Sequence, residues 1–258
     1  MKATAGVLVS GLLATLMVAG SSQAQPSTPS RCAGCHFAAL AASERWHLSE
    51  WDHSAHGRAN VGCERCHGGD PTTFESFLAH QGILGPTNPA SPLHRTNLPK
   101  TCGACHPGPF AAFQKSRHYE LLREGNRDTP TCVTCHGNVG AFLLSPKALY
   151  AECARCHAPG KVAPRSDLPA EGKIMLTSVR EVRASLDEAK TLIGRVRDKA
   201  RRESLEIEWQ AARAPLLEAV HAAHTFVYDQ MQDRLYITRK RVDLLMEQLA
   251  NPESPTGK

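Results

Sequence analysis

The chain has 258 residues, with 30 Lys or Arg against 25 Asp or Glu and a formal net charge of +5. Only one apolar run, from Gly6 to Ala19, approaches the length of a membrane span, so the sequence excludes a protein with several transmembrane helices. Aromatic residues are scarce at 5%, while the ten cysteines are conspicuous and carry most of the information about function.

The first 24 residues follow the pattern of a secretory signal peptide. Lys2 supplies the positive charge, the apolar run follows it, and Ser22 to Ala24 provides small residues ahead of Gln25. We therefore expect residues 1–24 to be removed and the mature chain to be periplasmic or otherwise extracytoplasmic. An uncleaved membrane anchor is the alternative, but an anchor normally has an apolar run of about 20 residues.

Five copies of Cys-x-x-Cys-His account for every cysteine in the chain. This spacing is the attachment signature of haem c, in which two thiols bond to the porphyrin and the adjacent imidazole becomes the proximal iron ligand. We therefore predict five covalent haem c groups. The attachment cysteines are Cys32 and Cys35, Cys63 and Cys66, Cys102 and Cys105, Cys132 and Cys135, and Cys153 and Cys156; the proximal ligands are His36, His67, His106, His136 and His157.

Two other kinds of site use paired cysteines. Structural zinc sites and thioredoxin-like redox pairs both contain Cys-x-x-Cys, but neither requires a histidine directly after the second cysteine. With 13 histidines in the chain, a chance histidine at that position arises about once in twenty motifs, so five by chance are very improbable. Covalent haem is the favoured interpretation, and zinc is its main alternative.

The segment from residue 25 to residue 160 holds all five motifs. It shows neither a sustained helical period nor a strand period, and Pro and Gly interrupt it throughout. Such a segment cannot bury enough apolar side-chain surface by itself. We therefore expect a mainly α domain of short helices and loops, with little or no sheet, whose core consists of haem groups.

Haem attachment also changes the charge balance. Each haem brings two propionates, so the loaded mature protein has a net charge of about −1 when oxidised and about −6 when reduced. The basic residues of this segment are then partners for propionates and solvent rather than a phosphate-binding patch. We expect no nucleic-acid partner.

A second repeat lies between the haem motifs. The six residues from Trp51 to His56 and the six from Phe113 to His118 both read aromatic, two residues, Ser, one residue, His. We expect each to form a short helix that packs its aromatic residue on a porphyrin and offers its histidine as a distal ligand. Coincidence between ordinary surface histidines is the alternative.

These motifs resemble the multihaem cytochromes grouped around cytochrome c nitrite reductase, hydroxylamine oxidoreductase and octahaem reductases. The resemblance covers about half of the chain and is greatest from Cys102 to His157. The sequence departs from the group in two respects: no motif has the Cys-x-x-Cys-Lys form of the nitrite reductase catalytic haem, and Val139 stands where many relatives have a histidine. The resemblance implies multihaem redox chemistry and long C-terminal helices, often at subunit contacts.

Eight of the 13 histidines lie outside the motifs, enough to give every haem a second imidazole. Methionine is a weaker candidate than histidine for the distal position at iron, because the methionines of the mature chain all follow the haem segment. Bis-histidine ligation predicts fairly low potentials. The candidate distal ligands are His56, His80, His94, His118 and His224, with His221 as the alternative to His224; His47 and His53 are expected at the surface or in reserve.

The C-terminal part differs in composition. We divide it into a linker over 161–172, an antiparallel helical hairpin over 173–250 and a tail over 251–258. Apolar residues from Val179 to Ala200 repeat at three and four residues, and a second such series follows Pro215, which should start or kink the second helix. His224 lies on that series, where a buried core histidine is the alternative to a haem ligand. The hairpin either docks on the haem domain or mediates a homodimer.

The sequence favours an exported pentahaem cytochrome that transfers electrons between redox partners such as a quinol dehydrogenase, a reductase or another cytochrome. Peripheral association with a membrane is compatible with this reading. The main alternative is an enzyme acting on nitrite or hydroxylamine through one haem with an open position, and the sequence identifies no catalytic residue for it. A structural module built around the hairpin is the least favoured class.

Overall fold

The computed structural model describes residues 31–39, 46–140, 142–163 and 165–251. The expected signal peptide and most of the expected tail lie outside these residues. All regular secondary structure in the described ranges is helical, so the predicted mainly α fold is confirmed. None of the helices described is both long enough and apolar enough to cross a membrane.

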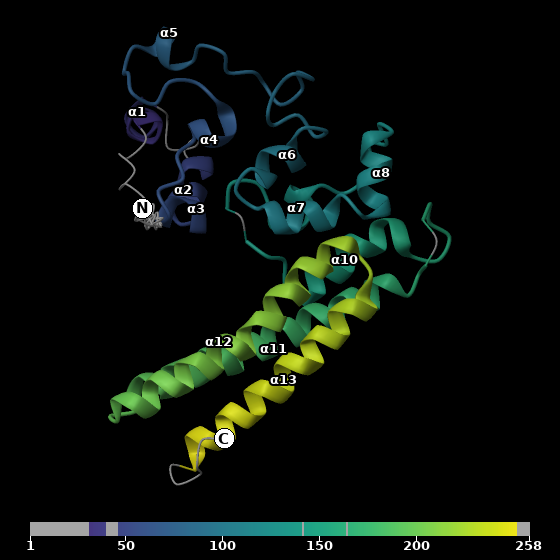
Figure 1. Cartoon of the computed structure of the whole chain (residues 1–258). Helices are drawn as coiled ribbons and strands as arrows, with labels where there is room; N and C mark the ends of the chain where they lie inside the picture. Colours follow the sequence, from purple (N-terminus) through teal and green to yellow (C-terminus); the bar gives the residue numbers. More distant parts are fainter. Residues whose placement is uncertain (1–30, 40–45, 141, 164, 252–258) are drawn as a thin grey trace, which may run out of the picture.

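The described residues from Arg31 to His157 form ten short helices joined by turns and loops (Figure 1). Several end where glycine adopts a positive φ, as at Gly68 (79°) after α4 and Gly137 (70°) after α9, a conformation that other residues rarely adopt. The helices are α1 (Arg31–Ala39), α2 (Trp46–Asp52), α3 (Ala55–Arg58), α4 (Glu64–His67), α5 (Ser76–Ala79), α6 (Leu98–Gly103), α7 (Pro107–Phe113), α8 (Arg117–Arg123), α9 (Cys132–His136) and α10 (Pro146–His157).

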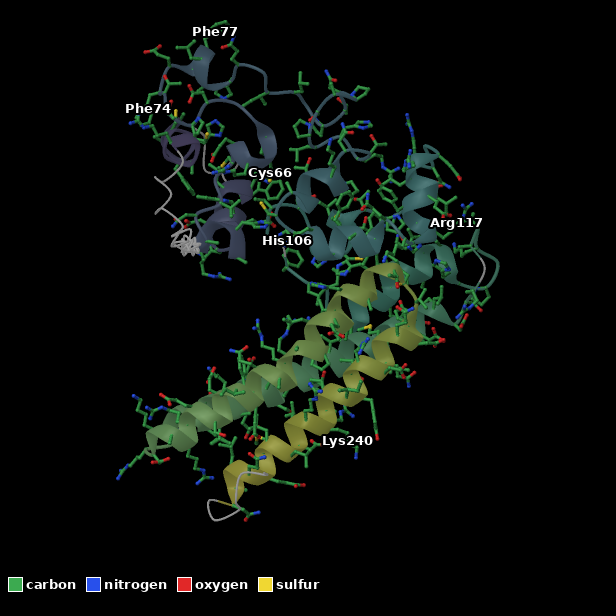
Figure 2. The ribbon with its side chains drawn as sticks, in the orientation of Figure 1. Cys66, Phe74, Phe77, His106, Arg117 and Lys240 are labelled. Carbon is green, nitrogen blue, oxygen red and sulfur yellow. The ribbon has the colours of Figure 1, made fainter. Side chains whose placement is uncertain are left out.

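This first region buries very few apolar side chains. In the described residues up to His157 the buried hydrophobic residues are Ala33, Leu48, Leu98, Phe113 and Leu122, and they do not form a cluster with one another. Large apolar side chains such as Phe74 and Phe77 are exposed, and Figure 2 shows both at the outer edge of the region. The polypeptide therefore does not supply a hydrophobic core here.

The second half of the chain forms three long helices, α11 (Leu168–Arg195), α12 (Lys199–Ala222) and α13 (Tyr228–Ala250), with the 3-10 turn η2 (Ala223–Thr225) between the last two. They run side by side and extend away from the first region (Figure 1). Helix α11 begins inside the stretch that the sequence analysis treats as a linker. Three helices replace the two expected because the chain turns at Val196, which is extended, and at Phe226, which is left-handed.

The three helices share one apolar interior. Positions from the predicted helical repeat, including Val182, Leu186 and Ile193 on α11 and Val242 and Leu245 on α13, are each at most 3% exposed. Residues from α12 complete two adjoining clusters. A pattern of three- and four-residue steps places such side chains on one helix face, and the bundle buries that face.

Pro215 lies inside α12 instead of starting a helix. Proline has no backbone N–H, so it leaves the carbonyl of Ala211, four residues earlier, without its helical partner. Arg241 of α13 donates a hydrogen bond to that carbonyl with an Nη1 to O distance of 2.6 Å. A side chain from the neighbouring helix thus satisfies the group that proline leaves free, and α12 continues through Pro215.

The bundle contacts the first region at two places: α10 packs along α11, and α7 packs against α12 and η2. Gly108 of α7 faces His221 of α12 so closely that a Cβ added at Gly108 would lie 2.7 Å from Cε1 of the His221 ring. Phe226, at the turn after η2, packs against Phe113 of α7 with ring centroids 6.3 Å apart. The η2 turn is therefore held against the haem-motif region.

Candidate haem sites

Each of the five motifs lies on or at the end of a short helix. The first, second, fourth and fifth lie on α1, α4, α9 and α10; the third begins in the last turn of α6, and its His106 directly precedes α7. One helical turn brings the two sulfurs and the following imidazole of a motif to the same side of the backbone. All ten cysteines are free of disulfide bonds, so every thiol remains available.

Every motif histidine faces a second histidine. The ring centroids are 5.8 Å apart for His36 and His80, 6.3 Å for His47 and His67, 6.1 Å for His56 and His106, 6.1 Å for His136 and His224, and 6.0 Å for His118 and His157. Two imidazoles bound to opposite faces of one iron have centroids about 6 Å apart, because each metal–nitrogen bond is about 2 Å long. The five spacings therefore fit a metal ion between each pair.

Four of the five candidate distal histidines, His56, His80, His118 and His224, are placed opposite a motif histidine. His94 is not: its Nδ1 lies 2.7 Å from Thr96 Oγ1, within a tight turn of the loop before α6. His47, which the sequence analysis expected at the surface or in reserve as a ligand, faces His67. His53, of which the same was expected, is exposed.

The sequence analysis preferred His94 to His47 as a distal ligand. Both lie outside any recognised repeat, so no local pattern supported either choice. The tertiary contacts decide between them, because α2 folds back on α4 and carries His47 to His67. One signal was available in the sequence: His47 lies between the first two motifs, as His56 does, and each belongs to a short helix there.

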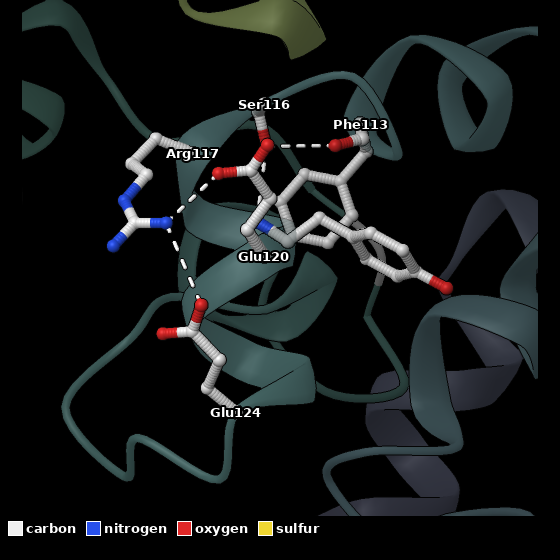
Figure 3. Close-up of polar contacts among 6 residues, drawn as sticks. Phe113, Ser116, Arg117, Glu120 and Glu124 are labelled. Atoms are coloured by element: carbon white, nitrogen blue, oxygen red, sulfur yellow. Dashed lines mark hydrogen bonds and ion pairs between the residues drawn. The ribbon is translucent and has the colours of Figure 1, made fainter.

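The serine of the second repeat starts a helix in both copies. Ser54 Oγ accepts a hydrogen bond from the N–H of Gly57 at 3.0 Å, and Ser116 Oγ accepts one from the N–H of Tyr119 at 3.1 Å. Figure 3 shows the second copy, in which Ser116 Oγ also donates to the carbonyl of Phe113. Each serine is an N-cap that fixes the direction of the histidine two residues later.

Arg117, the first residue of α8, forms ion pairs with carboxylates on the same helix. Its Nη1 lies 2.9 Å from Glu120 and 3.6 Å from Glu124 (Figure 3). These side chains are more than half exposed, so the ion pairs contribute little to stability. They keep the guanidinium on the outer side of the helix that presents His118.

Burial lowers the pKa of His67, His118 and His136 and so favours the neutral form of these three imidazoles. Burial lowers the pKa of His118 to about 4, with a further contribution from the charge of His157. Burial and then the neighbouring His47 and His36 lower the pKa of His67, and burial is likewise the largest cause at His136. Only a neutral imidazole has a lone pair for a metal, so this environment suits ligation.

Two of the distal candidates have their ring orientation defined by the backbone. Nδ1 of His80 lies 2.7 Å from the carbonyl of Ser76, and Nδ1 of His224 lies 2.9 Å from the carbonyl of Val220. A carbonyl only accepts hydrogen bonds, so Nδ1 must carry the proton and Nε2 keeps its lone pair. Histidines that bind metals are commonly oriented in this way.

The motifs are neighbours in space in the order in which they occur in the sequence. Burial raises the pKa of the Cys63 thiol to about 11, and the nearby Cys32 adds to the shift. The pKa of the Cys66 thiol is also raised, first by burial and then by the nearby Cys102. The pKa of Cys135 is raised by burial and then by Cys153. Successive pairs of thiols therefore lie close enough for their charges to interact.

The junction between the second and third motifs is visible in Figure 2, where Cys66 and His106 lie between α4 and α6. His56, which faces His106, comes from α3, on the N-terminal side of the second motif. One histidine pair thus joins the segment before residue 70 to the segment after residue 98. The fourth pair joins the haem-motif region to the C-terminal bundle, because His224 belongs to η2.

The donor set fits haem c better than zinc. Within the described ranges, no group of three or more His, Cys, Asp or Glu side chains is arranged to hold a bare metal ion, and a structural zinc site needs four such ligands. What the chain offers instead is paired thiols together with opposed imidazoles. When bound, haem c would supply a one-electron iron centre at each pair.

Comparisons with known proteins agree with this chemistry over parts of the chain. Residues 89–158 match the family described as cytochrome c7 and related cytochrome c, and residues 14–68 match cytochrome c554 and c-prime. Two stretches of the chain are thus related to multihaem c-type cytochromes. Together the two matches include all five Cys-x-x-Cys-His motifs in full and the whole of α6 to α10.

The C-type polyheme cytochrome OmcB of Geobacter sulfurreducens is similar to part of the chain. Sequences from two strains, DL-1 / KN400 and ATCC 51573 / DSM 12127 / PCA, are each 34% identical over 124 residues, or 44% of this chain. The match spans 14% of the length of these relatives. No solved structure matches the chain significantly. The narrower resemblance to the nitrite reductase group stays a prediction.

Proposed function

We propose that the protein is an exported pentahaem c-type cytochrome that passes electrons between redox partners through five bis-histidine haems. The observation that carries this proposal is the opposition of a second imidazole to each of the five motif histidines, at centroid distances of 5.8 to 6.3 Å. The relation of two stretches to multihaem c-type cytochromes supports haem c as the cofactor. The number of haems is part of the proposal.

The side chains of the protein have three tasks in this function. The ten thiols hold the porphyrins covalently, so the haems do not dissociate. The ten imidazoles would hold the five irons in opposed pairs, which would leave no place for a substrate at iron. The short helices keep neighbouring motifs close, as the interactions between Cys66 and Cys102 and between Cys135 and Cys153 indicate, and short separations are what electron transfer needs.

The enzymatic alternative requires one haem with an open axial position. The main support for it in the sequence was Val139, which replaces a histidine common in the resembling group. The placement of His224 opposite His136 weakens that support, because the bundle supplies an imidazole to the fourth motif from a distant part of the chain. An electron carrier is therefore the better-supported function.

The test is electron paramagnetic resonance of the oxidised protein, made in a host that matures c-type cytochromes. We expect only low-spin ferric signals, and a mass that corresponds to the chain from about Gln25 with five haems. A high-spin signal that changes on addition of nitrite or hydroxylamine would replace the carrier with the enzyme. Colourless protein, or zinc bound to the cysteines, would reject both functions.

The proposal extends to location and partners. An extracytoplasmic location rests on the signal-like sequence of residues 1–24 and on the chemistry, since bacteria attach haem c outside the cytoplasmic membrane. Redox proteins are the expected partners, and a homodimer through the C-terminal helices remains a prediction. The mature mass also tests removal of the signal peptide.

A further inference from the structure

His118 differs from the other distal candidates in one respect. Its Nδ1 is buried and has no hydrogen-bond partner among the described residues. His80 and His224, in contrast, each place Nδ1 within 2.9 Å of a backbone carbonyl. A buried donor without a partner is uncommon in proteins, and it indicates either strain or a functional requirement.

The difference follows from the helix end that carries each histidine. His80 follows the last turn of α5, and His224 follows the last turn of α12. The last carbonyls of a helix have no partner within it, so the carbonyl four residues before each of these histidines can accept from its ring. His118 is instead the second residue of α8, so no turn of its own helix precedes it.

An aromatic ring occupies the space beside His118. The ring of Phe226 meets it edge-on, with centroids 4.4 Å apart and planes at 90°. Phe226 also packs against Phe113, which is buried. Phe226 has a left-handed backbone with φ of 58°, a conformation that is costly for a bulky residue and persists only when its surroundings hold it.

These contacts affect how strongly His118 donates electrons to iron. A hydrogen bond from Nδ1–H to an acceptor makes an imidazole more basic, and a more basic ligand stabilises the ferric state. Without that bond the ferrous state gains relative to the ferric state. The apolar surroundings act in the same direction, because burial disfavours the oxidised haem, which carries one more positive charge.

We propose that the haem held by the fifth motif, between His157 and His118, has a higher midpoint potential than the haems of the first and fourth motifs. This inference rests on the proposed function and adds to it an order of midpoint potentials among the haems. An electron shared among these three haems then resides preferentially at the fifth motif, next to the junction with the C-terminal bundle. Phe226 is a positioning residue that keeps the ring of His118 without an acceptor.

The first experiment assigns the fifth-motif haem by spectroelectrochemical titration of the holoprotein. In the His118→Met variant a methionine thioether replaces the imidazole and raises the midpoint potential of that haem. The redox wave of the fifth-motif haem is therefore lost from the wild-type titration curve, and a wave at higher potential replaces it. We expect the wave that disappears to lie above at least two others. If it is one of the two lowest waves, the proposal is wrong.

The second experiment adds an acceptor. Phe226→Asn offers a side-chain carbonyl, and asparagine tolerates the left-handed backbone. We expect the ferric to ferrous ratio of the assigned haem at a fixed potential to rise about tenfold, which corresponds to a decrease of about 59 mV. The matched control Phe226→Leu removes the ring without adding an acceptor and should shift the same wave by less than about threefold. Equal shifts in both variants, or no shift in Phe226→Asn, would overturn the proposal.

The number and ligation of the haems can be tested separately from the order of their potentials. The wild-type mass and paramagnetic resonance spectrum test the number and ligation of the haems before any variant is made. If five low-spin haems are present and the assigned wave is among the lowest, only the direction of the potentials is wrong. If the wild-type protein has fewer haems or a high-spin haem, the proposed function itself is wrong.

Discussion

The two halves of the molecule differ in whether their side chains form an apolar core. The C-terminal bundle buries Val182, Leu186, Ile193, Leu205 and Leu245 to 3% exposure or less in two adjoining clusters. The haem-motif region is longer and has no such cluster among its described residues, only short helices that present cysteine and histidine. The comparison teaches that the bundle has an apolar core of its own, and we expect the other region to fold only with its cofactors.

The largest expected effect is therefore loss of haem. When the full chain is made in a host without cytochrome maturation, we expect residues 31–158 to be degraded rapidly by protease, while residues 168–250 resist. The physical reason is that the first region cannot offset its conformational entropy without the porphyrins. Limited proteolysis followed by mass spectrometry measures this. Equal resistance of the two regions would remove the contrast between them.

Next in size is removal of one axial ligand. We expect His47→Ala to convert one haem of five to the high-spin state, because His47 faces His67. His94→Ala is the matched control and should leave all haems low-spin, since His94 is hydrogen-bonded to Thr96 within its own turn. The ferric paramagnetic resonance spectra of both variants provide the measurement. A high-spin signal in the His94 variant would reverse the assignment.

A cavity in the bundle should have a smaller but clear effect. Leu245→Ala removes a side chain that is 1% exposed and should lower the free energy of unfolding of the bundle by about 2–5 kcal/mol. In the first region Leu78→Ala, at a leucine that is 48% exposed, should change stability by less than about 0.5 kcal/mol. Thermal unfolding followed by far-ultraviolet circular dichroism compares them. Similar losses would argue against a separate apolar core in the bundle.

The smallest predicted effect concerns a helix cap. Ser116→Ala removes the acceptor for the N–H of Tyr119 and should reduce stability by about 1 kcal/mol. Ser116→Asp keeps an acceptor at the N-cap and serves as the control. Chemical denaturation of the oxidised holoprotein, monitored at the haem absorption, tests both. If the aspartate variant loses as much as the alanine variant, the cap is not the role of Ser116.

Much of the candidate site was predictable from local sequence. Cys-x-x-Cys-His is a contiguous signal, so the ten thiols and the five motif histidines needed no tertiary information. The repeat that ends at His56 and His118 was also readable, because a serine N-cap and a histidine two residues later act within one helical turn. The three- and four-residue periodicity likewise predicted the buried face of the bundle.

Only the tertiary structure decided which histidines meet. The choice of His47 over His94, the approach of His224 to His136, and the satisfaction of Ala211 by Arg241 all join residues that are far apart in sequence. No local pattern encodes such contacts, because they depend on where turns at Val196 and Phe226 direct whole helices. The sequence by itself thus determined the chemistry of each motif, and the packing of distant helices determined its partner.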